Sequence, residues 1–210
     1  EPDEVNTLAR EMPVAELPDE VLVYLLGSRY CETDHLGAKA WQLFGHMPPG
    51  WARVQAIVDY VHSRLSFGYG YARATRTAAQ AHEERVGVCR DFAHLAITLC
   101  RCMNIPARYV NGYLGDIGVP VDPAPMDFSA WLEVFLDGKW YTFDPRHNKP
   151  RSGRGVIGRG RDGTEVARVV ALGPRRGGVG SVVTAELIGT EPVDGVVASD
   201  HYGVLATVRY

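Results

Sequence analysis

The sequence has few cysteines, no long apolar run and no large excess of one charge, and each shortage argues against a class of protein. Its 210 residues include four cysteines with no CxxC pair and no framework spacing. We therefore expect reduced thiols and no zinc site. No apolar run approaches the roughly twenty residues that cross a bilayer, and no signal peptide opens the chain, so we expect a cytoplasmic protein without a membrane partner. A net charge of −3 argues against nucleic acid as a partner.

The chain does have enough apolar sequence for one well-buried domain with appendages, because 46% of its residues are hydrophobic. Hydrophobic periodicity and turn residues predict an α+β order of elements. The residues 137–138, Asp-Gly, are a strong hairpin signal. Residues 115–126 are expected as a loop, and the Arg- and Gly-rich residues 149–180 as a solvated strand pair and linker, with a role in holding an acidic partner left open. The expected helices are 18–26, 36–44, 51–65, 77–84 and 92–103, and the expected strands are 105–110, 131–135 and 140–143.

Cys89 is the most informative residue, because it lies where a polar approach gives way to the apolar helical run 92–103. The free N–H groups and the dipole at a helix start favour a thiolate over a thiol. The main-chain N–H of Cys89 could also donate to a developing oxyanion. Cys89 is therefore a candidate nucleophile.

Four blocks of sequence, in order, resemble the bacterial transglutaminase-like cysteine enzymes. They are residues 87–93, 104–113, 130–134 and 140–145, and the resemblance extends over about residues 15–165. It implies a papain-like α+β core in which a Cys-bearing helix packs on an antiparallel sheet. It also implies a Cys-His-Asp triad that needs no metal and no organic cofactor.

Within this resemblance, Cys89 and Asp144 match the triad, but the position of the family's histidine is Ser129. Serine has no titration near neutral pH and no second ring nitrogen for an aspartate to orient. Three explanations stay open. Ser129 is an introduced change, or it is a natural loss that leaves a binding protein, or another group takes over the proton transfer.

Three histidines are candidates for the replacement base. His94 is five residues into the Cys89 helix, hence on another face, and packing is the better interpretation. His147 follows the triad aspartate closely, although a loop after a strand usually points away from the sheet centre. His201 would need the terminal strands to join the sheet edge.

Three further residues are candidates for substrate binding, and two of them have a plain structural alternative. Trp131 shares a strand face with Ser129 by the period of two. Tyr69 belongs to the aromatic and glycine stretch 67–71, and Asp127 to the loop before Ser129. Core packing of Trp131 and turn packing of Tyr69 remain alternatives.

The expected domain organisation is a core over residues 1–165 followed by a C-terminal β extension over 166–210. Residues 191–205, which include Ser199-Asp200-His201, look like the end of the endonuclease/exonuclease/phosphatase family. That family needs a large sandwich and several metal-binding carboxylates for which this chain has no room, so two terminal strands are expected instead. The chain starts without Met, and relatives usually carry a β-rich domain before the core, so removal of an N-terminal domain stays open.

The resemblance implies a cysteine hydrolase or acyltransferase that acts on a peptide, protein or small amide through a thioester at Cys89. Hydrolysis is the favoured outcome over cross-linking. The alternative is a non-catalytic peptide-binding pseudoenzyme that keeps the cleft.

Overall fold

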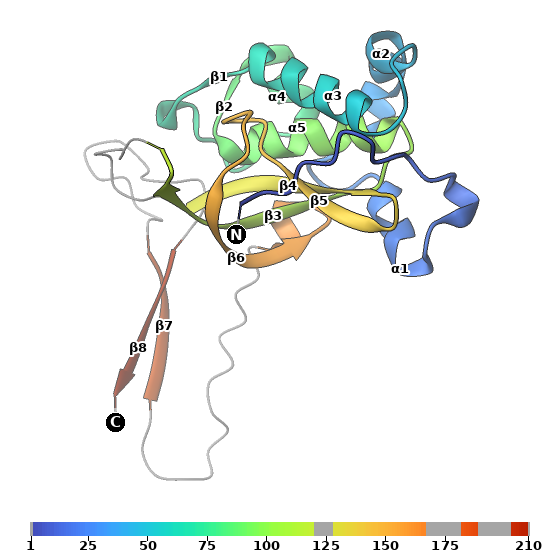
Figure 1. The fold of residues 1–210 in the computed structure, drawn as a ribbon. Coiled ribbons are helices and arrows are strands. Elements are labelled where there is room, and N and C mark those ends of the chain that lie inside the picture. Colours follow the sequence, from blue (N-terminus) through green and yellow to red (C-terminus); the bar gives the residue numbers. More distant parts are fainter. Residues whose placement is uncertain (1, 120–127, 167–181, 189–202, 210) are drawn as a thin grey trace.

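The protein folds around a four-stranded antiparallel sheet whose one face is covered by the long helices (Figure 1). The structure is a computed structural model and describes residues 2–119, 128–166, 182–188 and 203–209. Short helical turns come first, and the sheet strands follow the long helices. The elements are η1 Val14–Glu16, α1 Asp19–Leu22, η2 Val23–Leu25, α2 Thr33–Phe44, α3 Trp51–Arg64, β1 Ser66–Phe67, η3 Tyr69–Tyr71, α4 Ala78–Glu84, β2 Val86–Gly87, α5 Cys89–Cys102, β3 Ala107–Ile117, β4 Phe128–Leu136, β5 Lys139–Phe143, β6 Ser152–Gly160, α6 Gly163–Val166, β7 Val182–Ile188 and β8 Gly203–Arg209.

The main sheet has the order β5-β4-β3-β6, and each of these neighbouring pairs is antiparallel. The turn between β4 and β5 falls on Asp137 and Gly138, whose φ angles of 46° and 80° are the positive pair that a tight hairpin turn requires. The predicted hairpin is therefore confirmed. The loop predicted from residue 115 is wrong at its start, because β3 continues to Ile117, which still pairs with Ser152 of β6.

Helix α5 lies at the centre of the core, between the sheet and the helices α3 and α4 (Figure 1). On β4, the side chains of Ala130, Leu132 and Val134 belong to the same apolar cluster as α5. The alternate residues Trp131 and Glu133 instead contact arginines of β6, so they lie on the opposite face of the sheet. The expected papain-like α+β fold, with the Cys-bearing helix on an antiparallel sheet, is confirmed.

Part of the arginine-rich stretch, residues 152–160, forms the edge strand β6 of the main sheet, and not a separate solvated strand pair or a linker. β6 pairs with β3 on one side, and its arginines Arg154 and Arg159 form ion pairs with carboxylates from distant parts of the chain. These arginines are thereby engaged within the molecule. The ion pairs are Arg151–Asp116, Arg154–Asp3, Arg154–Asp144, Arg159–Glu133 and Arg161–Glu165.

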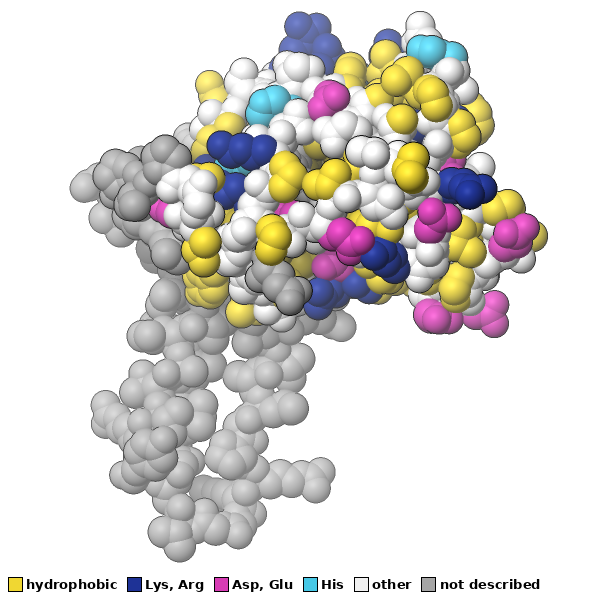
Figure 2. Space-filling model, viewed as in Figure 1, with side chains coloured by type: hydrophobic (Ala, Val, Ile, Leu, Met, Phe, Trp, Pro, Cys, Tyr) yellow, Lys and Arg dark blue, Asp and Glu magenta, His cyan; other side chains and the backbone are white. Residues whose placement is uncertain are grey.

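The first N-terminal residues meet the start of β6, because Pro2 forms an isolated bridge with Ser152 and the Asp3 N–H donates to the Arg151 carbonyl at 2.8 Å. In the tail, β7 and β8 pair with each other, while the triplet at 199–201 lies outside the described residues. On the face shown in Figure 2, acidic and basic side chains are interspersed. Within the described ranges, no helix has both the length and the apolar character to cross a membrane.

Candidate active site

Cys89 is the first residue of α5, and the segment before it is built to start the helix there. The Asp91 carboxylate accepts the Val88 N–H at 3.0 Å and is itself held by Arg76 at 2.9 Å. Asp91 approaches the chain so closely that a Cβ on Gly87 would lie 2.6 Å from the Asp91 Cβ. A glycine at this position therefore lets the acidic cap fold back, and the cap fixes the residue that follows.

The Cys89 thiol meets the start of β4. Its Sγ lies 3.9 Å from the main-chain oxygen of Phe128, the residue before Ser129, and Cys89 is only 5% exposed. The start of α5 and the start of β4 therefore lie close together.

Ser129 is buried, and its Oγ has no hydrogen-bond partner in the described part of the chain. Ser129 and Trp131 are two residues apart on β4, so their side chains point to the same face of the sheet, which is the face away from α5. A buried hydroxyl without a partner costs free energy and adds no proton relay. Ser129 therefore makes no described contact that would let it act as a base for Cys89.

Asp144 follows β5, and its carboxylate is fully committed to hydrogen bonds. Oδ2 lies 3.0 Å from Nδ1 of His147 and accepts from Nη2 of Arg154 at 3.1 Å. Oδ1 accepts the main-chain N–H groups of Arg146 and His147, each at 3.1 Å. The imidazole that Asp144 orients is therefore that of His147, on the same turn. Ser129 is not among the hydrogen-bond partners of Asp144 in the described part of the chain.

These contacts keep Asp144 ionised. Burial by itself raises the pKa of the Asp144 carboxyl, but the hydrogen bonds and charge of His147, together with the Arg154 guanidinium, bring that pKa down to about 2. Hydrogen bonding to the charged form therefore outweighs desolvation. At neutral pH Asp144 is therefore a carboxylate.

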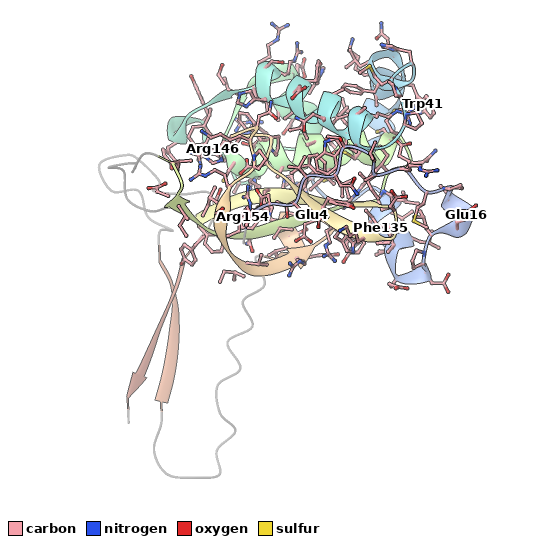
Figure 3. The ribbon with its side chains drawn as sticks, in the orientation of Figure 1. Glu4, Glu16, Trp41, Phe135, Arg146 and Arg154 are labelled. Carbon is pink, nitrogen blue, oxygen red and sulfur yellow. The ribbon has the colours of Figure 1, made fainter. Side chains whose placement is uncertain are left out.

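Arg154 joins three parts of the site. It donates to both Asp3 and Asp144, and its guanidinium lies 4.7 Å from the ring centre of Trp131. Figure 3 shows Arg154 at the level of the sheet, near the N-terminal segment that carries Glu4, with Arg146 closer to the helices. The described ring contact of Trp131 is thus with Arg154, and its proposed role in substrate binding stays a prediction.

The turn that carries His147 lies against the segment leading into Cys89. The Arg146 guanidinium stacks 3.7 Å from the ring centre of Phe67. Phe67 pairs with Gly87, two residues before the thiol, and its ring lies 6.4 Å from that of Phe92 on the first turn of α5. The Asp144 turn and the start of α5 are therefore held together through one aromatic side chain.

The remaining sequence candidates fall in different places. Tyr69 is 37% exposed and stands edge-on to Phe67 at 5.2 Å, so it borders this region. Asp127 lies outside the described residues. His94 is fully buried, stacks on Tyr30 at 5.0 Å and accepts the Gly163 N–H at 3.0 Å, which confirms its packing role.

A cavity of about 320 Å³ reaches the site from the Asp144 side. It lies between the N-terminal segment, α3 and the end of β5, and Cys89, Ser129 and His147 are not among its lining residues. The cavity is therefore behind the carboxylate and not at the thiol. Its walls include Asp3, Glu4, Trp51, Gln55, Asp144 and Asn148.

The fold and site define a class: a papain-like α+β protein with a cysteine at the start of a central helix packed on an antiparallel sheet. This chain belongs to the transglutaminase-like superfamily, whose family model matches residues 40–145. Three partners in the site, Asp3, His147 and Arg154, lie outside the matched range.

Two relatives extend this assignment. An uncharacterised protein from Mycobacterium leprae is 31% identical over 140 residues, which cover 64% of this chain and 49% of that protein. The crystal structure of a candidate cysteine protease from Cytophaga hutchinsonii is 36% identical, with a TM-score of 0.69, and covers 76% of this chain and 53% of the other. The chain thus spans about half the length of these relatives.

A third comparison bears on the fold alone. The periplasmic domain of TgpA from Pseudomonas aeruginosa, bound to ethylmercury, is 20% identical with a TM-score of 0.50, over 64% of this chain and 51% of that chain. Taken together, the family match and the likeness to the Cytophaga structure support the transglutaminase-like fold.

Proposed function

We propose that this protein is a cysteine hydrolase or acyltransferase that acts on a peptide, protein or small amide through a thioester at Cys89. The observation that carries the proposal is the position of the thiol, at the first residue of α5 and against the start of β4. A helix start favours the thiolate, which is the attacking species.

The reaction has two steps. The Cys89 thiolate attacks the carbonyl carbon, the C–N bond breaks, and the amine leaves after taking up one proton, so that an acyl thioester remains. Water or a second amine then attacks the thioester and gives up a proton. The products are a carboxylic acid or a new amide, together with the regenerated thiol.

An activated ester tests this proposal even though the natural substrate is unidentified. Incubation with p-nitrophenyl acetate is expected to acetylate Cys89, as found by intact mass and peptide mapping, and hydroxylamine is expected to remove the acetyl group. Cys89→Ala should abolish the adduct, whereas Cys102→Ala should not. Absence of an adduct on folded protein over the pH range 6–9 would overturn the proposal.

The other three thiols should contribute little acetyl adduct in this assay. Cys31 and Cys100 are buried, and burial raises the pKa of both. Burial likewise raises the pKa of Cys102 to about 11. A neutral thiol is a poor nucleophile, so an adduct formed near neutral pH is expected on Cys89 before the others.

One observation favours a second candidate, a peptide-binding pseudoenzyme. Ser129 stands at the family's histidine position with a buried hydroxyl that has no partner among the described residues. On this alternative, peptides bind to both the wild-type protein and Cys89→Ala with the same affinity, and neither turns over an amide.

A further inference from the structure

Proton transfer is the part of the proposed reaction for which the family's usual position offers no group. Thioester formation must deliver a proton to the leaving amine, and hydrolysis must remove one from water. A serine hydroxyl performs neither task well near neutral pH. The residue that fills this role should be an imidazole held by the triad aspartate, as in other cysteine and serine enzymes.

His147 meets that requirement. Its Nδ1 lies 3.0 Å from Oδ2 of Asp144, and an ionised carboxylate can only accept a hydrogen bond. The proton is thereby fixed on Nδ1, which leaves Nε2 as the basic nitrogen. Nε2 has no hydrogen-bond partner within the described ranges, and the His147 side chain keeps 23% of its surface exposed.

The turn that carries His147 is anchored on both sides. Asp144 accepts the His147 N–H, and the Asn148 N–H returns to the Asp144 carbonyl at 2.7 Å. Arg146 stacks on Phe67, whose backbone pairs with Gly87 just before Cys89. The turn that carries the imidazole is therefore held by hydrogen bonds to Asp144 and, through Arg146, against the strand that pairs with the segment before Cys89.

We propose that His147 is the acid and base of this enzyme, in place of the histidine that the family carries at the position of Ser129. This inference rests on the proposed thioester chemistry. Nε2 takes the Cys89 proton, gives it to the departing amine as the C–N bond breaks, and then takes a proton from the water that attacks the thioester. That last proton returns to the Cys89 sulfur when the acid leaves.

Asp144 and Arg154 act through His147 and are positioning residues. Asp144 fixes the imidazole, and Arg154 donates to the same Asp144 oxygen while it also pairs with Asp3. Other charged or titratable groups lie around the turn on neighbouring elements. They are Arg146 on the turn itself, His62 of α3, whose Nδ1 is 3.0 Å from the Pro145 oxygen, and Asp59 of α3, which accepts from Asn148.

The decay of the acetyl adduct separates this inference from the function on which it rests. Wild-type protein and His147→Ala are each acetylated with p-nitrophenyl acetate, freed of reagent, and followed by intact mass between pH 5 and 9. His147→Ala is expected to lose the adduct at least about 100-fold more slowly, and its decay should no longer have an inflection in the range where imidazole titrates. Added imidazole should restore part of the rate.

His62→Ala is the matched control, because His62 contacts the same turn without touching Asp144. It should decay at the wild-type rate. If His147→Ala is unfolded by circular dichroism, His147→Gln, which can still donate to Asp144, serves in the same comparison. An adduct that forms and decays equally in the wild-type and His147 variants would overturn this inference and leave the thioester intact. Failure to form any adduct on Cys89 would instead remove the proposed function.

Discussion

Removing the charge of Asp144 should destabilise the protein by an amount that depends on pH. A pKa of about 2 in place of the usual 3.8 corresponds to about 2 kcal/mol of stability. Because the pKa is lower in the folded protein, this contribution is complete above about pH 4 and is lost as the pH falls toward 2. Asp144→Asn keeps an oxygen for the turn but removes the charge that His147 and Arg154 face.

Urea denaturation gives the magnitude directly. With a slope of about 2 kcal/mol per molar urea, Asp144→Asn should lower the unfolding midpoint by about 1 M at pH 7. The gap between variant and wild type should close as the pH is lowered from about 4 to 2, since wild-type Asp144 then becomes neutral as well.

Asp59→Asn is the control for this prediction. Asp59 is an exposed carboxylate of α3 that accepts from Asn148 at 2.9 Å. Its loss should change the unfolding free energy by no more than about 0.5 kcal/mol. If Asp144→Asn behaves like Asp59→Asn, or if its deficit is the same at pH 3 and pH 7, the account of Asp144 as a buried, paired carboxylate is wrong.

Two other substitutions test the helix start and the opposite face of the sheet. Gly87→Ala places a Cβ 2.6 Å from that of Asp91. We expect the free energy of unfolding in urea to fall by about 1–3 kcal/mol and the acetylation of Cys89 to slow. Acetylation at the wild-type rate would refute the role of this cap. Glu133→Gln removes the buried charge that pairs with Arg108 and Arg159. It should lower the free energy of unfolding by about 1.5–3 kcal/mol and leave the rate of Cys89 acetylation unchanged. A parallel loss of that rate would contradict the separation of the Glu133 cluster from the Cys89 site.

Local patterns in the sequence are sufficient to place Cys89, the candidate nucleophile, at the start of a helix. The change from a polar approach to an apolar helical run places Cys89 next to the helix expected over 92–103, and α5 begins at Cys89 itself. The Asp-Gly pair at 137–138 likewise locates the hairpin, because both residues adopt the positive φ angles that the tight turn needs. In both cases, a few neighbouring residues determine the structure.

The partners of Asp144 are harder to predict for physical reasons. The sequence alone disfavours His147 as the replacement base, because a loop after a strand usually points outward. In the structure, main-chain hydrogen bonds fold this turn back onto Asp144. Asp3 and Arg154 are 151 residues apart in sequence, and no local pattern signals that they pair. The mixture of Arg and Gly in residues 153–160 is as typical of a solvated linker as of a strand, so it does not reveal that this segment closes the edge of the main sheet.

The measurement that tests the central claim most directly is the rate of Cys89 alkylation by iodoacetamide as a function of pH, with peptide mapping to separate Cys89 from the other three thiols. An activated nucleophile predicts a thiolate that titrates well below the ordinary value of roughly 8.5. A normal or raised value would mean that neither the helix start nor His147 activates the thiol, and would contradict the account of this protein as a cysteine enzyme.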